Sequence, residues 1–249
     1  MTVISLFAGA ITFCFTTLLT IAGVGAAFIL IPVFLALGIE VHTAMATALL
    51  LNAVAMSVAS VNFIRKNLVV WKIAFPILVV ASALSPLGAW VSQGLDRTVL
   101  LWLFIGFLVF AALMMLFYTP RVRETTSGIG PLLGVGLGVG SLAGFVGGLL
   151  GVGGGNIIVP ALVVLGLDPK KASATTSFVV IFASLAGFLG HVSLAGINFA
   201  LLAWTTVGSA GGAVLGSWLM TDKLKGRQVK LLIGLILIAI AVKMAWGLL

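Results

Sequence analysis

Long apolar runs separated by short charged or Gly/Pro-rich breaks dominate the sequence. A membrane-spanning helix needs about 20 apolar residues to cross roughly 30 Å of hydrocarbon. The runs predict ten membrane segments, at residues 3–22, 24–38, 43–64, 70–91, 98–118, 129–150, 152–167, 172–190, 197–220 and 229–249. The second and seventh segments are short, and each follows a glycine-rich stretch where helix continuity is least favourable.

The second half of the chain repeats the first. Residues 23–47 overlay residues 151–175 without a gap at an offset of 128, and ten of these positions are identical. We therefore expect two homologous halves of about five segments each. Repeat 1 occupies residues 1–120, a cytoplasmic linker residues 121–128, and repeat 2 residues 129–249.

The composition places this chain in a lipid bilayer. Of its 249 residues, 62% are apolar and 7% are charged, and the mean hydropathy is +1.34. These values exclude a soluble globular domain and a disordered one. The net charge of +8 would suggest a nucleic-acid partner in a soluble chain. Because the basic residues lie in the breaks between apolar runs, we expect no nucleic acid.

The positive charges predict an orientation. If every segment changes sides and the N-terminus is outside, eleven of the thirteen Lys and Arg residues fall in cytoplasmic connections, and only Arg97 and Lys243 do not. Each half then crosses an odd number of times, which predicts an inverted repeat of the kind found in secondary transporters. This distribution of basic residues does not distinguish five spans per half from three spans plus a hairpin formed by the first two segments.

The glycine-rich stretches are the main candidate for a binding site. Unwound backbone at membrane depth persists only where it is buried in protein or lines a wet cavity. Helices that begin there would aim free N–H groups and the positive ends of their dipoles at the same place, which suits an anion. The alternative is that these glycines only allow close helix packing. The substrate-binding candidates in these stretches are Gly23, Gly25, Gly153, Gly154, Gly155 and Asn156.

Other glycines recur at intervals of two or four residues within single segments. They are Gly134, Gly136, Gly138, Gly140, Gly144 and Gly148 in the sixth segment, and Gly208, Gly212 and Gly216 in the ninth. Small residues at this spacing are typical of tightly packed membrane helices, so we predict a packing role for both sets.

Polar side chains in the third and eighth segments supply further candidates for substrate binding. Thr175, Thr176 and Ser177 cluster near the start of the eighth segment, Thr47 corresponds to Thr175, and Asn52 lies in the middle of the third. A satisfied contact between helices is an equally good interpretation of Asn52.

A polar stripe on the eighth segment has two interpretations. Ser173, Ser177, Ser184 and His191 share one helix face. In lipid, such a stripe either lines a cavity or makes hydrogen bonds between helices.

Acidic residues begin two of the segments. Glu40 and Asp168 each follow a glycine-containing turn, and both predict helix N-caps. Proton coupling by Glu40 with His42 is the alternative role.

Catalytic motifs are absent from the sequence. The five carboxylates and two histidines fall at segment ends or in loops, and no Ser/His/Asp arrangement, HExxH motif or metal-ligand cluster occurs. The single cysteine, Cys14, excludes a disulfide framework. We therefore expect no enzyme activity, no metal and no cofactor.

The glycine motif of the second half resembles that of a known family. The stretch GVGGGNIIVPALVVLGLDPKKASATTS at residues 151–177 is similar to the sulfite exporter TauE/SafE family of bacterial permeases. The resemblance covers essentially the whole chain. The family motif falls on Gly151, Gly153, Gly154, Gly155, Pro160, Thr176 and Ser177. Repeat 1 departs from it, since Ala26 and Ala27 replace two of the glycines and Leu49 stands in place of the serine.

The resemblance implies an all-α polytopic permease that moves small sulfur-containing anions such as sulfite or organosulfonates, usually outward, across the bacterial inner membrane. Both termini would then be periplasmic. Our leading hypothesis is an exporter that works by alternating access between inverted halves, with a small anion and the lipid bilayer as its partners. A membrane scaffold without transport and an anion channel are the alternatives. The sequence leaves open a role for protons or a counter-ion, and a homodimer.

Overall fold

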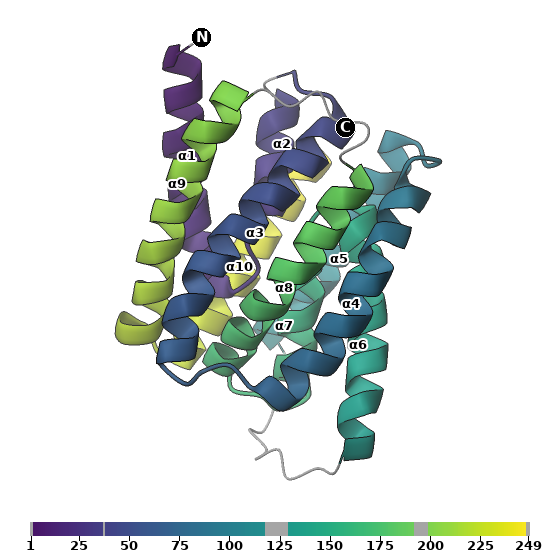
Figure 1. The fold of residues 1–249 in the computed structure, drawn as a ribbon, viewed down its shortest axis with the longest axis vertical. Helices are drawn as coiled ribbons and strands as arrows, with labels where there is room; N and C mark the ends of the chain where they lie inside the picture. The colour runs from purple at the N-terminus through teal and green to yellow at the C-terminus, as the bar shows by residue number, and fades with distance from the viewer. Residues whose placement is uncertain (1, 37, 118–128, 192–198, 248–249) are drawn as a thin grey trace.

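The computed structural model describes residues 2–36, 38–117, 129–191 and 199–247, and the regular secondary structure of this part of the chain is all helical (Figure 1). The predicted all-α class is confirmed for these residues. The elements are α1 (Thr2–Ala22), α2 (Ala27–Ala36), α3 (Val41–Arg65), α4 (Trp71–Ser92), α5 (Arg97–Phe117), α6 (Ile129–Leu149), α7 (Gly155–Val164), α8 (Pro169–His191), α9 (Phe199–Trp218), a π-helical turn η2 (Leu219–Lys223) and α10 (Gly226–Trp246). The linker predicted at residues 121–128 lies outside the described residues.

The helices correspond to the predicted segments, and two of them are half-length. Helices α2 and α7 have 10 residues each, so each extends about 15 Å, half the thickness of the hydrocarbon core. Within the described ranges, α3, α4 and α8 are long and apolar enough to cross a membrane. In Figure 1, α2 lies towards the end of the molecule from which α1 enters, and α7 towards the end from which α6 enters.

The elements recur along the chain at the offset found in the sequence. Helices α2 and α7, α3 and α8, and α4 and α9 each begin 128 residues apart. In Figure 1, α1 enters from the end of the molecule that carries both chain termini, and α6 enters from the opposite end.

Helices of the two halves are interleaved. Helix α1 packs along α9, and α6 packs along α4, so the first helix of each half lies against the fourth helix of the other. Helices α3 and α8 run side by side between these two pairs, and α5 packs against α10.

Glycines form the contact surfaces of both interleaved pairs. A Cβ atom added to Gly144 or Gly148 would overlap the α4 backbone at Ala81 or Ser85. The same addition at Gly212 would overlap the carbonyl of Phe13 on α1. The predicted packing role is therefore confirmed for these glycines, since only a residue without a side chain allows these backbones to approach so closely. Among the described residues, a Cβ at Gly134 or Gly138 would meet nothing within 4 Å, so the predicted packing role is wrong at those two positions.

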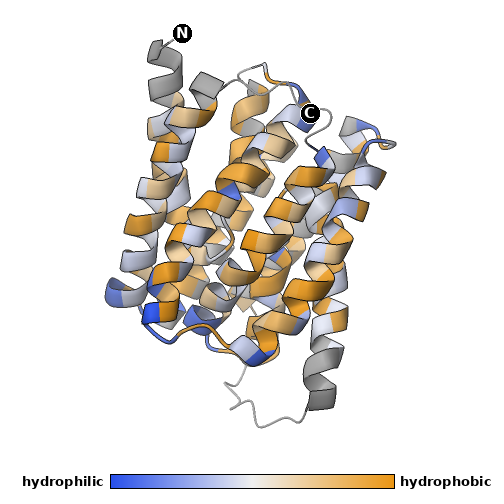
Figure 2. Ribbon diagram, viewed as in Figure 1, coloured by the Kyte–Doolittle hydropathy of each residue, from blue (hydrophilic) through white to orange (hydrophobic). Residues whose placement is uncertain are grey.

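Basic residues gather at one end of the molecule. They lie at the connections opposite the termini, where Figure 2 shows hydrophilic residues beyond an apolar central region. These residues are Arg65, Lys66, Lys72, Lys170, Lys171, Lys223, Lys225 and Arg227. Arg97 begins α5 and Lys243 lies in the last turn of α10, both at the other end.

A Gly144→Ala substitution tests the packing surface between α4 and α6. We expect a loss of about 1–3 kcal/mol of stability, because the added methyl group overlaps the Ala81 backbone. Gly138→Ala is the matched control on the same helix, since a Cβ there meets nothing within 4 Å. The control should be neutral or slightly stabilising. Thermal unfolding in detergent, followed by tryptophan fluorescence, measures both, and equal effects would contradict the packing role.

Candidate functional site

Two unwound stretches interrupt the chain where α1 and α6 end. Break 1 comprises residues 23–26, between α1 and α2, and break 2 comprises residues 151–154, between α6 and α7. The break glycines have positive φ, with values of 71° at Gly23, 80° at Gly25 and 75° at Gly153 and Gly154. Side-chain-bearing residues rarely adopt this conformation. The glycines are thus required by the backbone path.

The two breaks touch each other in the interior. A Cβ atom added to Gly155 would lie 2.7 Å from the carbonyl oxygen of Val24 and 3.0 Å from its Cα. Both residues are buried. Because α1 and α6 enter from opposite ends (Figure 1), this contact lies between the two ends. The start of α7 and the end of break 1 therefore meet inside the protein.

The helices that follow the breaks present free amide groups there. The N–H groups of Ile157 and Ile158 donate to the Gly154 oxygen at 3.0 and 3.2 Å. Within the described ranges, the N–H groups of Gly155 and Asn156 have no acceptor. Ala27 begins α2 and corresponds to Gly155 in the repeat. Its backbone N–H also has no acceptor among the described residues. Such first-turn amides carry the positive end of the helix dipole.

Asn52 of α3 lies between the two breaks. A Cβ atom on Gly25 would overlap the Asn52 side-chain amide, and one on Gly153 would lie 3.0 Å from Asn52 Nδ2. Nδ2 donates to Ser184 Oγ at 3.0 Å, which confirms that Asn52 makes a contact between helices. Its Oδ1 is buried and has no partner in the part of the chain that the structure describes.

One face of α8 covers both breaks. Ser173 packs against Gly23 and donates from Oγ to the Ala22 carbonyl at 2.9 Å, whereas Ser184 lies beside break 2. Thr176 lies about one helical turn after Ser173 on α8. Its side chain is fully buried, and Oγ1 has no partner among the described residues.

Asn156 completes the set of buried polar groups. It lies in the first turn of α7 directly after Gly155, is 1% exposed, and has no described partner for either side-chain amide atom. An unsatisfied buried polar group costs about 1–3 kcal/mol, so such groups are rare unless they serve a bound species. We refer to breaks 1 and 2 with Asn52, Asn156 and Thr176 as the break junction.

The break junction contains neutral groups. Among the described residues, no Lys, Arg, Asp or Glu side chain is buried, and no group of three or more His, Cys, Asp or Glu residues could hold a metal ion. The available donors are backbone N–H groups, amides and a hydroxyl. In a buried setting, this arrangement suits an anion with several oxygen acceptors.

The other predicted hydroxyl groups have different surroundings. Thr175 Oγ1 accepts a hydrogen bond from the Val70 N–H at 3.0 Å, at the start of α4. Ser177 Oγ donates to the Ser173 carbonyl of its own helix at 2.8 Å. Thr47 is buried on α3 at the position corresponding to Thr175. Substrate binding by these three residues stays a prediction.

The polar stripe on α8 bonds to protein groups. Ser173, Ser184 and His191 contact the Ala22 carbonyl, Asn52 and the Gly148 carbonyl, respectively. These bonds join α8 to other helices, which favours the helix-contact interpretation of the stripe over the cavity interpretation.

Both predicted N-caps are confirmed. Glu40 Oε2 accepts from the Thr43 N–H at 2.9 Å, and Asp168 Oδ1 accepts from the Lys170 N–H at 3.0 Å. Partial burial raises the pKa of Glu40, but hydrogen bonds from the His42 and Thr43 backbone outweigh it, so the pKa lies below its ordinary value. Glu40 is therefore a stably ionised cap at neutral pH.

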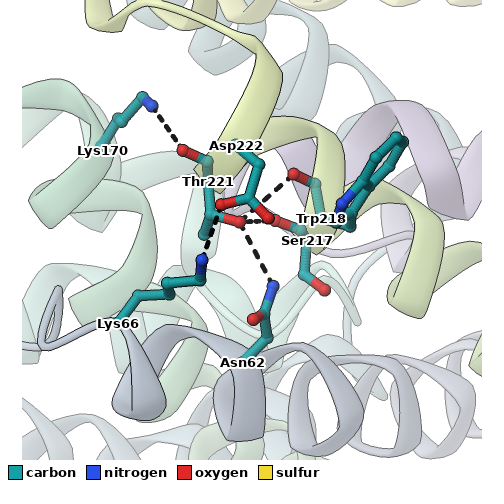
Figure 3. Close-up of polar contacts among 7 residues, drawn as sticks. All are labelled: Asn62, Lys66, Lys170, Ser217, Trp218, Thr221 and Asp222. Atoms are coloured by element: carbon teal, nitrogen blue, oxygen red, sulfur yellow. Dashed lines mark hydrogen bonds and ion pairs between the residues drawn. The ribbon is translucent and has the colours of Figure 1, made fainter.

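A polar cluster at the basic end was not predicted from the sequence. Lys66 and Asp222 form an ion pair at 2.8 Å, and Lys170 Nζ donates to the Thr221 carbonyl at 2.9 Å (Figure 3). Asn62 Nδ2 donates to Thr221 Oγ1 at 3.4 Å. The hydrogen bond from Lys66 lowers the pKa of Asp222. This cluster ties α3 and α8 to the π-helical turn after α9, a feature with no sequence signal beyond the loop charges.

Comparison with known proteins gives matches to membrane transport proteins. The chain matches the family described as Sulfite exporter TauE/SafE over residues 8–244. It is 30% identical over 113 residues to the Probable membrane transporter protein YunE of Bacillus subtilis, covering 45% of this chain and 41% of that protein. It is 41% identical over 69 residues to Sulfite exporter TauE/SafE family protein 1 of Arabidopsis thaliana, covering 28% of this chain and 14% of that protein. The chain thus aligns with less than half the length of these relatives. No solved structure matches it.

A Gly25→Ala substitution tests the contact between break 1 and Asn52. Gly38→Ala is the matched control, because Gly38 has a nearly identical φ of 79° against 80° at Gly25, yet a Cβ there meets no described atom within 4 Å. The control should lose about 1–2 kcal/mol from the left-handed conformation alone.

Gly25→Ala should lose a further 1–3 kcal/mol or so, because the methyl group overlaps the Asn52 amide. Chemical or thermal unfolding in detergent compares the two variants. Equal losses would show that Asn52 does not lie against break 1.

Proposed function

The chain belongs to the sulfite exporter TauE/SafE family of membrane transporters, and we propose that it exports small sulfur-containing anions by alternating access. Sulfite and organosulfonates are the substrate class. The observation that carries the proposal is the break junction, where free helix N-terminal amides and unsatisfied buried polar side chains meet in the interior.

The break junction matches the hydrogen-bonding needs of a sulfite or sulfonate group. Such a group presents three oxygen acceptors and a negative charge. The amides of Gly155 and Asn156 and the hydroxyl of Thr176 supply donors on one side, and the amide of Ala27 supplies one from the other half. Binding by dipole ends and neutral donors avoids burying a fixed cation, which would be costly in lipid.

The interleaved halves support alternating access. Break 1 is reached from one end and break 2 from the other, and each half places its first helix against the fourth helix of its partner half. We infer an inverted repeat of residues 1–120 and 129–249 around the break junction. Two equivalent arrangements of such halves would open the junction to one side of the membrane and then to the other.

The charge distribution supports an orientation. The basic end would face the cytoplasm according to the positive-inside rule, which places both termini in the periplasm if the membrane is a bacterial inner membrane. The polar cluster of Lys66, Asp222 and Lys170 would then lie at the cytoplasmic end of α3 and α8.

Anion-dependent thermal stabilisation of the purified protein tests the proposal. We expect sulfite, sulfoacetate and methanesulfonate to raise the unfolding temperature and acetate to have a smaller effect, because a ligand stabilises the state that binds it. A scaffold would show no stabilisation by any of these anions. In proteoliposomes, saturable flux accelerated by anion on the opposite side supports a carrier, and non-saturating flux supports a channel.

Neighbouring threonines test the site. Thr176→Val removes a buried hydroxyl that has no described partner, so the unliganded protein should be as stable or more stable. Its anion affinity should fall about tenfold, which corresponds to one lost hydrogen bond to a charged ligand.

Thr175→Val is the matched control for this substitution. It removes the hydroxyl that accepts from the Val70 N–H, so unliganded stability should fall by about 1–3 kcal/mol, and its anion affinity should fall less than that of Thr176→Val. Thermal unfolding with and without methanesulfonate separates the two effects. If Thr176→Val keeps full affinity, Thr176 is not a ligand.

A further inference from the structure

The only two histidines of the chain face each other. His42 is the second residue of α3 and His191 the last residue of α8, and their ring centroids are 5.9 Å apart. Because α3 and α8 run in opposite directions (Figure 1), the histidine pair lies at the end of these helices away from the Lys66–Asp222 ion pair.

Glu40, His42 and His191 are three titratable groups that differ in burial. Glu40 is exposed, His42 is half-buried with a buried Nδ1, and His191 is fully buried. Each imidazole has an Nδ1 atom without a partner in the described part of the chain. Among the described residues, the pair thus offers two buried nitrogen atoms without a hydrogen-bond partner.

His191 is bonded directly to the helix end that leads into break 2. Its Nε2 lies 3.0 Å from the Gly148 carbonyl oxygen, so the neutral ring donates its Nε2 proton and keeps a lone pair on Nδ1. The same carbonyl accepts from the Gly151 N–H at 3.2 Å. One backbone oxygen therefore links the imidazole to break 2.

The geometry of the pair suits one positive charge better than two. From α3, the His42 ring faces His191, and Glu40 precedes His42 by two residues. Helix α6 contributes the Gly148 carbonyl, and α4, which packs against Gly190, carries Lys72 as its one charged residue, at its far end. Two imidazolium rings at 5.9 Å repel each other, whereas the carboxylate attracts one.

At the opposite end of α3 and α8, the residue that corresponds to His42 in the repeat is a lysine. His42 corresponds to Lys170 at the offset of 128. Lys170 donates from Nζ to the Thr221 carbonyl. A fixed cation therefore lies at one end, and a group that is cationic only when protonated lies at the other.

We propose that His42 and His191 together bind one proton and that this proton strengthens anion binding at the break junction. The proton comes from solvent on the Glu40 side, binds an imidazole Nδ1 and leaves by the same route. This inference rests on the proposed function, because the anion at the break junction is the second partner of the coupling.

Distance sets the expected size of the coupling. Ser184, which lies beside break 2, precedes His191 by seven residues on α8, a rise of about 10 Å. A unit charge at this distance changes the affinity for an anion roughly tenfold at the effective dielectric constant of protein interiors. By linkage, anion binding strengthens proton binding by the same factor.

Calorimetric titration of the full chain with methanesulfonate between pH 5 and 8 tests the proposal. This sulfonate keeps one negative charge over the whole range. The dissociation constant should be about tenfold lower at the acidic limit than at the alkaline one. His42→Gln and His191→Gln should flatten the profile while keeping the affinity seen at pH 8. Lys243→Gln, a charge removed at the same end of the molecule, should leave the profile unchanged.

A second measurement covers the case in which the His191 variant does not fold. Wild-type protein labelled at histidine gives two imidazole NMR signals, because the chain has two histidines. The midpoint of their titration should move about one pH unit higher when methanesulfonate is added. Binding with a flat pH profile and unmoved imidazole titrations overturns this inference and leaves the proposed function standing. Absence of binding at every pH overturns both.

Discussion

Unwound backbone inside a bilayer must be enclosed by protein, and this constraint organises the whole structure. Breaks 1 and 2 have backbone amides without helical partners, so neither could face lipid. Each break supplies part of the enclosure of the other, through the contact between Val24 and Gly155. Helices α3 and α8 pack against the breaks, and the glycine contacts of α1 with α9 and of α6 with α4 bring these backbones close together.

The same constraint accounts for the chemistry of the interior. Charged side chains are confined to the helix ends, and the buried polar residues of the described chain are hydroxyls, amides and one imidazole. An anion in such a place is held by helix N-termini, as the proposed transport of sulfur-containing anions requires. Among the described residues, His191 is the one buried side chain that can carry a charge, which gives the histidine pair its proposed influence on the break junction.

Much of this architecture could be predicted from the sequence, because it depends on local patterns. The offset of 128 between the halves, the two short helices and the glycines with positive φ all follow from residue type and spacing. The sequence could not distinguish Thr175 from Thr176, since neighbouring residues differ by about 100° around a helix. It also gave no indication that Asn52 touches both breaks, or that His42 lies against His191, because such contacts depend on how distant helices pack.

The position of a bound anion tests the central claim most directly. Selenite is a sulfite analogue whose selenium atom gives an anomalous X-ray signal, so crystals grown with it would show where the anion lies. The account predicts one anomalous peak within hydrogen-bonding distance of the Gly155 and Asn156 amides, between the two breaks. Continuous helices through residues 23–26 and 151–154, or a peak only at the basic end of the molecule, would contradict it.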